Sequence, residues 1–219
     1  MRSMGRLTTG LALLSLVPAA AAAQESRPFT DSWFWGVKGG AMTVETPFES
    51  AIAPTVGIDW LITRSRAGLY MSVEQGFFED QFGTVFDASA SSGMRDVSLK
   101  NFRRASFALM AFPKPWGSVR PYAGLGIALN LVQRARPVGA FTDPDDMALV
   151  LDRVENRRSR TSVLFTGGVQ GMAGPMNVFA QATAMPTGSN FLLNGADSMY
   201  LLEAGVRFNV GSAIERIDR

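Results

Sequence analysis

Residues 119–131 constrain the fold of this chain more than any other segment, because two dissimilar sets of side chains alternate along them. Successive side chains of a strand point to opposite faces, which predicts one apolar face and one polar or small face. The apolar face is Ala123, Leu125, Ile127, Leu129 and Leu131, and the opposite face is Arg120, Tyr122, Gly124, Gly126, Ala128 and Asn130. A soluble sheet buries its apolar face against a second layer, whereas a membrane-spanning barrel turns that face to lipid. The rest of the chain has to decide between these two folds.

Residues 1–23 have the pattern of a cleaved secretory signal. Arg2 and Arg6 give a positive start, residues 11–17 form an apolar segment, and residues 21–23 are small. The apolar segment is too short to span a bilayer, which takes about 20 residues. The sequence therefore predicts a signal peptide at 1–23, a lead-in at 24–31, a barrel at 32–210 and a polar C-terminal tail at 211–219.

The chain that follows the signal has balanced charge and no cysteine. Once Arg2 and Arg6 are removed, 19 basic residues stand against 19 acidic ones. This balance gives no reason to expect nucleic acid as a partner. An exported protein without cysteine has no disulfide, so another kind of closure must hold the fold together.

Eight segments alternate as strands do, and the connections between them alternate in length. The expected strands are residues 32–43, 55–63, 67–78, 99–112, 119–131, 161–173, 177–185 and 198–210. Short connections rich in Gly or Pro are expected at 63–66, 113–117 and 174–177, and long ones at 44–54, 79–98, 132–160 and 186–197. Outer-membrane barrels have short periplasmic turns and longer external loops. The pattern predicts an all-β fold, an eight-stranded antiparallel transmembrane β-barrel.

The tryptophans agree with this prediction. Trp33, Trp35, Trp60 and Trp116 all fall near the expected short turns. Aromatic girdles lie at the interfaces of membrane barrels, whereas the core tryptophans of a soluble sandwich have no reason to gather at one end. We therefore expect these four residues to form a periplasmic aromatic girdle.

The inner positions of the expected strands collect seven charged side chains. They are Lys38, Asp59, Glu74, Arg104, Arg120, Glu203 and Arg207. Unpaired charges are costly in a low-dielectric interior, so these groups should pair or stay hydrated. An eight-stranded barrel is just wide enough for side chains to fill it. Two interpretations stay open: a filled lumen of paired charges, or a narrow polar path beside small residues such as Gly124 and Gly126.

The chain contains no histidine, which removes the usual nucleophilic triads and most zinc sites. The acidic group Asp143, Asp145, Asp146 and Asp152 lacks the spaced ligands of a calcium loop and is interpreted as part of a solvated loop. We expect no catalytic residue, no metal site and no cofactor.

The densest basic stretch lies on the longest expected loop. It consists of Arg153, Arg157, Arg158 and Arg160. Charge runs of this kind are common on solvated loops, and guanidinium groups also bind phosphates through two parallel hydrogen bonds. Contact with lipopolysaccharide is therefore the functional alternative for this stretch.

Two strands carry a resemblance to a known family. Residues 120–127, with the sequence RPYAGLGI, resemble the PY-x-G-x-G strand of small bacterial outer-membrane β-barrel proteins, and residues 200–210 resemble their closing strand. The pattern is similar to the OmpX, OmpW and OmpA-barrel group. One departure is the C-terminus, where Phe208 is followed by the polar residues 211–219 instead of ending the chain.

The resemblance implies a monomeric barrel in the outer membrane of a Gram-negative-type bacterium, inserted by the barrel assembly machinery. Its partners would be outer-membrane lipid and lipopolysaccharide. Three functions remain open. The first is a non-enzymatic structural or interaction role carried by external loops, and the second is a narrow channel or lateral path for small or hydrophobic solutes. The third is a soluble periplasmic lipocalin-like binding barrel.

Overall fold

The computed structural model describes residues 29–79 and 81–213, which form nine strands and one helix. The strands are β1 (Ser32–Glu45), β2 (Ser50–Arg64), β3 (Ala67–Gly76), β4 (Gln81–Phe86), β5 (Met94–Ala111), β6 (Val119–Pro137), β7 (Ser159–Ala173), β8 (Met176–Pro186) and β9 (Ser198–Ser212), and the helix is α1 (Pro144–Arg157). The predicted signal peptide, most of the lead-in and the end of the tail lie outside the described residues.

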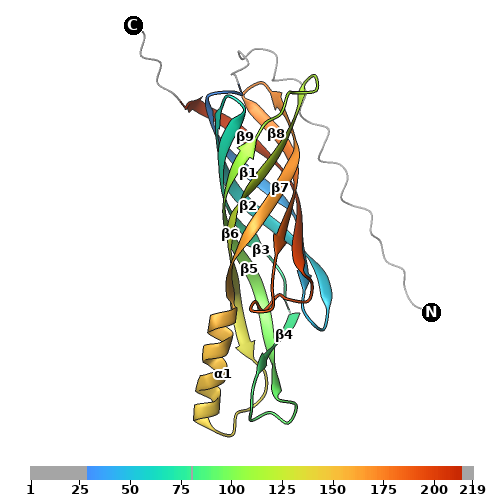
Figure 1. Ribbon diagram of the computed structural model, residues 1–219, viewed down its shortest axis with the longest axis vertical. Coiled ribbons are helices and arrows are strands. Elements are labelled where there is room, and N and C mark those ends of the chain that lie inside the picture. The colour runs from blue at the N-terminus through green and yellow to red at the C-terminus, as the bar shows by residue number, and fades with distance from the viewer. Residues whose placement is uncertain (1–28, 80, 214–219) are drawn as a thin grey trace, which may run out of the picture.

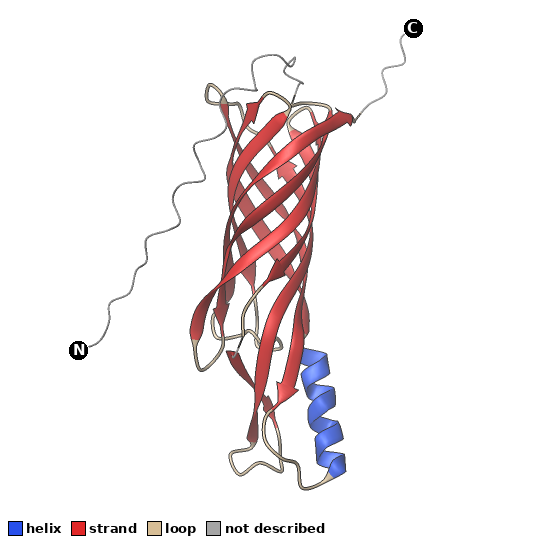
Figure 2. Ribbon diagram, turned by 180° about the vertical axis from the view of Figure 1, so that it is seen from behind, coloured by secondary structure: helices blue, strands red, loops and turns tan. Residues whose placement is uncertain are grey.

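Eight of these strands close into a barrel (Figures 1 and 2). Their order is β3-β2-β1-β9-β8-β7-β6-β5, and β3 pairs back with β5 to close the ring. Every pairing is antiparallel. The predicted eight-stranded antiparallel barrel is therefore confirmed. The ring extends slightly past the expected residue 210, since Ser212 of β9 still pairs with Ser32 of β1.

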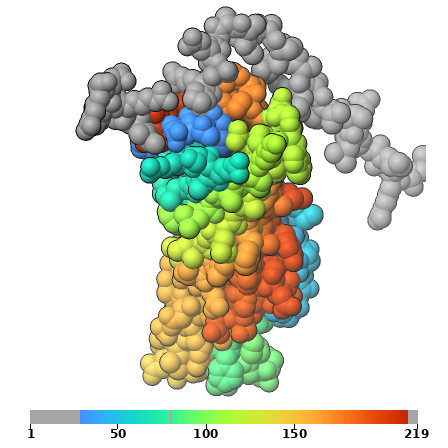
Figure 3. Space-filling model, turned by 45° about the horizontal axis from the view of Figure 1, so that its top comes forward, coloured from blue at the N-terminus to red at the C-terminus, as the bar shows by residue number. Residues whose placement is uncertain are grey.

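The two ends of the barrel differ. At one end, here called the turn end, the strands are joined by residues 65–66, 112–118 and 174–175. The opposite end, here called the loop end, holds residues 46–49, 77–79, 81–93, 138–158 and 187–197. Figures 1 and 3 place α1 beside the tip of the β4–β5 hairpin, as an extension of the barrel at the loop end. The predicted asymmetry is present for three of the four loop-end connections, which are longer than any connection at the turn end, whereas residues 46–49 are not.

The expected loops differ in length from the observed ones. Residues 44–54 are not a long loop, because β1 and β2 stay paired up to Glu45 and Ser50. Thr46 organises the tight turn that remains: its backbone N donates to Glu49 O at 2.9 Å, and its hydroxyl accepts from the backbone N of Glu49 at 3.3 Å. A side-chain hydroxyl can stabilise a turn without glycine or proline, so the Gly/Pro signal missed it.

Residues 79–98, expected as a loop, contain β4 and the first residues of β5, at the loop end. Along β5, the alternation of buried and exposed side chains shifts by one residue at Asn101, which has a positive φ of 58°. Leu99 and Phe102 are both buried, although they are three residues apart. Period-two alternation in the sequence is interrupted at such a point, although the strand itself continues through it.

Helix α1 lies within the expected loop 132–160, together with the end of β6. Asp143 is its N-cap and accepts a hydrogen bond from the backbone N of Asp145 at 2.9 Å, while Pro144 occupies the first turn. Acidic residues in the first turn favour a helix through its dipole. Of the acidic group interpreted as part of a solvated loop, Asp143, Asp145 and Asp146 therefore form a helix start, and Asp152 lies further along the same helix. No described helix is both long and apolar enough to cross a membrane.

The surface of the barrel is apolar and its middle is polar. Leu125, Ile127 and Leu129 of β6 are each more than half exposed, whereas Tyr122 and Asn130 on the other face are buried. The same division holds on the other barrel strands. A soluble lipocalin-like barrel has the reverse arrangement, so that expectation is wrong for this fold.

Candidate functional site: the charged interior of the barrel

Four charged side chains from four strands meet in the middle of the barrel. They are Lys38 of β1, Glu74 of β3, Arg104 of β5 and Glu203 of β9, and each side chain is at most 2% exposed. Lys38 and Arg104 both form ion pairs with Glu74, and Lys38 Nζ lies 3.1 Å from Glu203 Oε2. Arg104 Nη2 lies 3.8 Å from the same oxygen. Two cations and two anions balance, which is the condition under which buried charge is tolerated.

A second ion pair lies beside this cluster. Arg207 of β9 donates to Asp59 of β2 through Nε at 3.1 Å and Nη2 at 2.9 Å. Its guanidinium also lies 3.6 Å from the centroid of the Phe179 ring. A planar guanidinium suits both contacts, because it binds a carboxylate through its edge and an aromatic ring through its face. A lysine would satisfy neither geometry as well.

Neutral polar side chains connect the cluster to the surrounding wall. Lys38 Nζ donates to the Tyr70 hydroxyl at 2.8 Å, and Gln181 Nε2 donates to Glu203 at 3.0 Å. The Tyr122 hydroxyl donates in turn to Gln181 Oε1 at 3.1 Å. These contacts extend the network across the lumen. The site residues predicted from sequence thus included the charged members and omitted the tyrosines and glutamine, since neutral residues gave no charge signal.

Arg120 lies apart from the network, contrary to its expected place among the paired charges. It is at the turn end of β6, and its guanidinium lies 4.4 Å from the centroid of the Phe29 ring. Within the described ranges it forms no ion pair. Its inward position follows from the strand period, but its height in the barrel puts it out of reach of the carboxylates.

Apolar side chains close the lumen on both sides of the network. Phe34, Leu61 and Phe112 are buried toward the turn end, where Phe29 packs edge-on against Phe112 at 5.0 Å between centroids. Toward the loop end the interior is filled by another apolar set. This set is Met42, Phe102, Met185, Phe191, Leu192, Leu193 and Leu201, each at most 2% exposed.

Residues 191–193 belong to a segment expected to be an external loop. They fold inward instead, and the backbone N of Leu192 donates to Arg157 O at 3.1 Å. Three consecutive large apolar residues in a loop were the sequence signal for this burial. The expectation of a lumen lined by polar and small residues therefore holds only in the middle of the barrel.

The four tryptophans all lie at the turn end. Trp33, Trp35 and Trp116 are 43%, 40% and 71% exposed. Trp35 faces Trp60 across the β1–β2 pair, with 4.0 Å between ring centroids. These placements suit a girdle at one membrane interface.

The loop-end arginines are partly engaged with the protein itself. Arg153 donates to Phe86 O at 2.9 Å, and its guanidinium lies 5.1 Å from the centroid of the Phe86 ring. Arg158 pairs with Glu155 at 2.7 Å on the exposed side of α1. Arg157 and Arg160 are half-buried.

Asp87 and Arg95 hold the tip of the β4–β5 hairpin through an ion pair. The hydroxyl of Ser89 donates to Asp87 at 2.6 Å, and this hydrogen bond together with Arg95 lowers the pKa of Asp87 to about 2. The pKa is lowered on folding, so this stabilisation is present above the ordinary pKa of about 4 and is lost as the pH falls toward about 2.

No cluster of three or more His, Cys, Asp or Glu side chains that could hold a metal ion occurs among residues 29–79 and 81–213. The chemistry of the interior is instead that of paired charges that also hydrogen-bond to Tyr70 and Gln181, while Arg104 Nε has no partner among the described residues. Such an arrangement stabilises and closes a barrel.

A closed antiparallel barrel with an apolar surface, a tryptophan-rich turn end and a charged interior defines the class of small outer-membrane β-barrels. No family model and no curated protein sequence matches the chain. Solved structures do show the fold.

Neisserial surface protein A (NspA) has 14% sequence identity and a TM-score of 0.54, and the match covers 81% of this chain and 96% of that one. Ail, the attachment invasion locus protein of Yersinia pestis, has 15% identity and a TM-score of 0.46 in its complex with the heparin analogue sucrose octasulfate, with coverage of 82% and 99%. The outer-membrane enzyme PagL has 11% identity and a TM-score of 0.44, with coverage of 81% and 99%. At this identity, the likeness to NspA is one of fold.

Proposed function

We propose that this protein is a monomeric outer-membrane barrel with a closed interior, whose role is a structural or interaction role carried by the loop end. The filled lumen is the observation that carries the proposal. Arg104 and Arg207 are each 1% exposed in the middle of the barrel, and Phe102 and Leu192 close the loop end. A lumen occupied by paired charges and packed apolar side chains favours a non-conducting barrel over a channel.

The loop-end extension supports an interaction role because it is built around its own core. Val85 and Val97 of the β4–β5 hairpin are buried, as are Val150 and Val154 of α1. A packed core holds surface residues in a defined arrangement, which suits recognition better than a solvated loop does. In the proposed orientation the turn end is periplasmic and this extension faces the outside.

Conductance in a planar lipid bilayer tests the closed interior. We expect the purified, folded barrel to insert without producing stable current steps, with a general porin as the positive control and protein-free detergent as the negative one. Reproducible single-channel steps from the folded barrel would instead support the narrow-channel alternative and exclude the closed one.

Lipopolysaccharide is the partner that we propose for the loop end. Arg153, Arg157, Arg158 and Arg160 are the sites predicted from sequence, and Arg134 and Arg136 add two exposed guanidinium groups on β6. Phosphates bind guanidinium groups well, and a ligand that binds only the folded state raises the unfolding temperature.

A thermal-unfolding experiment in micelles tests this contact. We expect lipopolysaccharide to raise the unfolding temperature of the wild type, and the rise to be mostly lost when Arg134, Arg136, Arg157 and Arg160 are changed to Gln. The matched control is Lys114→Gln at the turn end, which removes an exposed cation and should keep the full rise. An undiminished rise in the fourfold variant would contradict the proposed contact.

A lateral path for hydrophobic solutes is the second candidate, and one observation favours it. The first residues of β2 pair only with β1, and β4 pairs only with β5, so the wall between β2 and β4 lacks a strand ladder at the loop end. The backbone N of Phe82 donates to Glu49 Oε1 at 3.0 Å across this interval.

A lateral path would accelerate the uptake of a hydrophobic dye by vesicles that contain the barrel. A closed interaction barrel would leave the rate of dye uptake unchanged.

Insertion by the barrel assembly machinery belongs to the same proposal. The aromatic residue nearest the C-terminus is Phe208, which is 47% exposed on the outer face of β9. Its position on the outside of the last strand supports a role as an internal recognition residue.

A further inference from the structure

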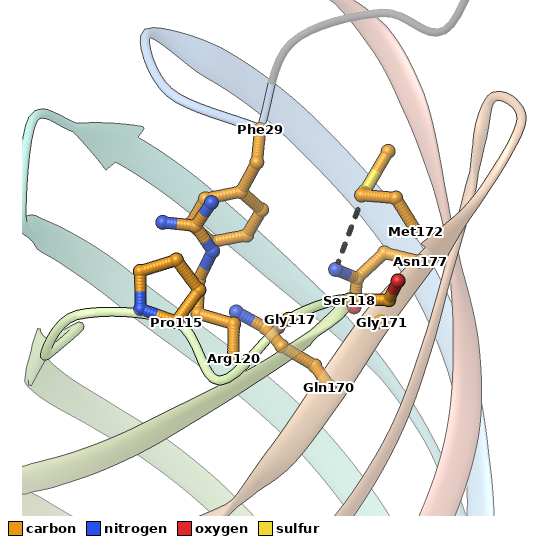
Figure 4. A pocket seen from close by; sticks show the side chains of 9 residues that line it. All are labelled: Phe29, Pro115, Gly117, Ser118, Arg120, Gln170, Gly171, Met172 and Asn177. Atoms are coloured by element: carbon orange, nitrogen blue, oxygen red, sulfur yellow. Dashed lines mark hydrogen bonds between the residues drawn. The ribbon is translucent and has the colours of Figure 1, made fainter.

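A pocket of about 270 Å³ lies at the turn end of the barrel, between β6, β7 and β8. Figure 4 shows Arg120 against Phe29 on one side of it, with Gln170 and Asn177 contributed by the next two strands. Arg120 and Gln170 are direct partners in the β6–β7 register, and Asn177 pairs with Met172 across β7 and β8. Three polar side chains therefore converge on one space.

Arg120 supplies this pocket with positive charge. Its guanidinium is half-buried and lies 4.4 Å from the centroid of the Phe29 ring, which orients it without neutralising it. Within residues 29–79 and 81–213 no carboxylate pairs with it. The other two inward-facing arginines of the barrel, Arg104 and Arg207, are both paired with acids.

Gln170 and Asn177 each present one buried polar atom that has no hydrogen-bond partner within the described part of the chain. Gln170 is 2% exposed and Asn177 is 0% exposed, and the unpartnered atoms are Gln170 Nε2 and Asn177 Oδ1. The other amide atoms are engaged: Gln170 Oε1 accepts from Arg207 at 3.3 Å, and Asn177 Nδ2 donates to the Met172 sulfur at 3.5 Å. The pocket thus offers one free donor and one free acceptor. Leaving such buried atoms unsatisfied costs stability, which a ligand with matching groups would recover.

We propose that this pocket binds a small molecule carrying a carboxylate or phosphate group together with a hydroxyl group. Arg120 and Gln170 Nε2 donate to the oxyanion, and Asn177 Oδ1 accepts from the hydroxyl. The volume limits the ligand to a small metabolite, since pockets for drug-sized ligands begin at about 300 Å³. The site is independent of the loop end and of whether the lumen conducts.

Amide resonances of the labelled barrel in micelles provide the test. The probes are glycerol 3-phosphate and lactate, which share the oxyanion and the hydroxyl, and glycerol, which lacks the charge. We expect at least one anionic probe to shift the Gln170 side-chain resonance saturably, while glycerol leaves it unchanged. Arg120→Met should weaken that binding about tenfold or more, because a charge-assisted hydrogen bond is lost. The matched control is Arg66→Met, which removes an exposed guanidinium from the β2–β3 turn at the same end of the barrel and should bind as the wild type does.

Three results would overturn the proposal: no saturable shift with either anionic probe, an equal shift with glycerol, or unchanged affinity in Arg120→Met. A shift with glycerol 3-phosphate alone assigns the site to phosphates, and one with lactate alone assigns it to carboxylates. If Arg120→Met yields no folded barrel, Arg120→Lys serves in its place. It keeps the charge but loses the planar fork, so it should bind more weakly than the wild type, and equal affinity would overturn the proposal.

Discussion

Replacing Glu74 with Gln is expected to destabilise the folded barrel by about 3–5 kcal/mol, the cost of removing one partner from a buried ion pair. Glu74 accepts from Ser72 at 2.8 Å and pairs with both Lys38 and Arg104. The glutamine keeps the shape of the side chain but leaves two cations facing one remaining carboxylate, that of Glu203. Urea unfolding of the barrel refolded into lipid vesicles measures the change.

The chain offers a matched control for this substitution. Glu79 pairs with Lys100 outside the barrel, where its side chain is 65% exposed. Glu79→Gln should therefore change the free energy of unfolding by no more than about 0.5 kcal/mol. A change of similar size in both variants would show that the interior ion pairs do not hold the barrel together.

A double substitution separates charge balance from loss of hydrogen bonds. Lys38→Met combined with Glu74→Gln leaves Arg104 and Glu203 as a balanced pair with 3.8 Å between their nearest charged atoms. We expect the double variant to be more stable than Glu74→Gln alone, because no buried charge is left in excess. If the losses of stability caused by the two substitutions simply add, the destabilisation by Glu74→Gln comes from lost packing and not from charge imbalance.

Replacing Gly126 with Ala is expected to have the second-largest effect, a loss of about 3 kcal/mol, at the upper end of the usual cost of overpacking. Gly126 faces the lumen from β6 and is the partner of Ala108 on β5. A methyl group there would overlap Phe107 O and would lie 2.6 Å from Ala108 Cα. Both obstacles are backbone atoms of the neighbouring strand, so relief requires the β5–β6 pair to separate.

Gly167→Ala is the control, because Gly167 lies on the outer face of β7 next to the same strand. Its added methyl group would meet nothing closer than Tyr122 O at 3.6 Å, an ordinary van der Waals contact. We expect this variant to unfold at the same or a slightly higher urea concentration than the wild type, since alanine restricts the unfolded chain. If Gly126→Ala were equally stable, the close approach of β5 and β6 would not be what requires glycine in this strand.

These two predictions depend on different kinds of information. The inward direction of Gly126, Glu74 and Arg104 follows from period-two alternation, which is a local property of an extended backbone. The same alternation indicated which residues form the apolar outer surface. Alternation along Val119–Leu131 does not show, however, at which level of the barrel axis a side chain lies. Arg120 is the example, because its inward face was predicted but its separation from every described carboxylate was not.

The sequence by itself determined the class of fold, the number of barrel strands and the two faces of each strand, because backbone period, turn residues and tryptophan positions are all local signals. Only the tertiary structure decided which charges meet, since Lys38, Glu74, Arg104 and Glu203 come from four strands whose register is set by pairing across the whole ring. It also decided that residues 191–193 fill the loop end and that Gln170 and Asn177 converge beside Arg120. The strand of residues 119–131 could be recognised from its own residues, but what lies behind it depends on its seven neighbours.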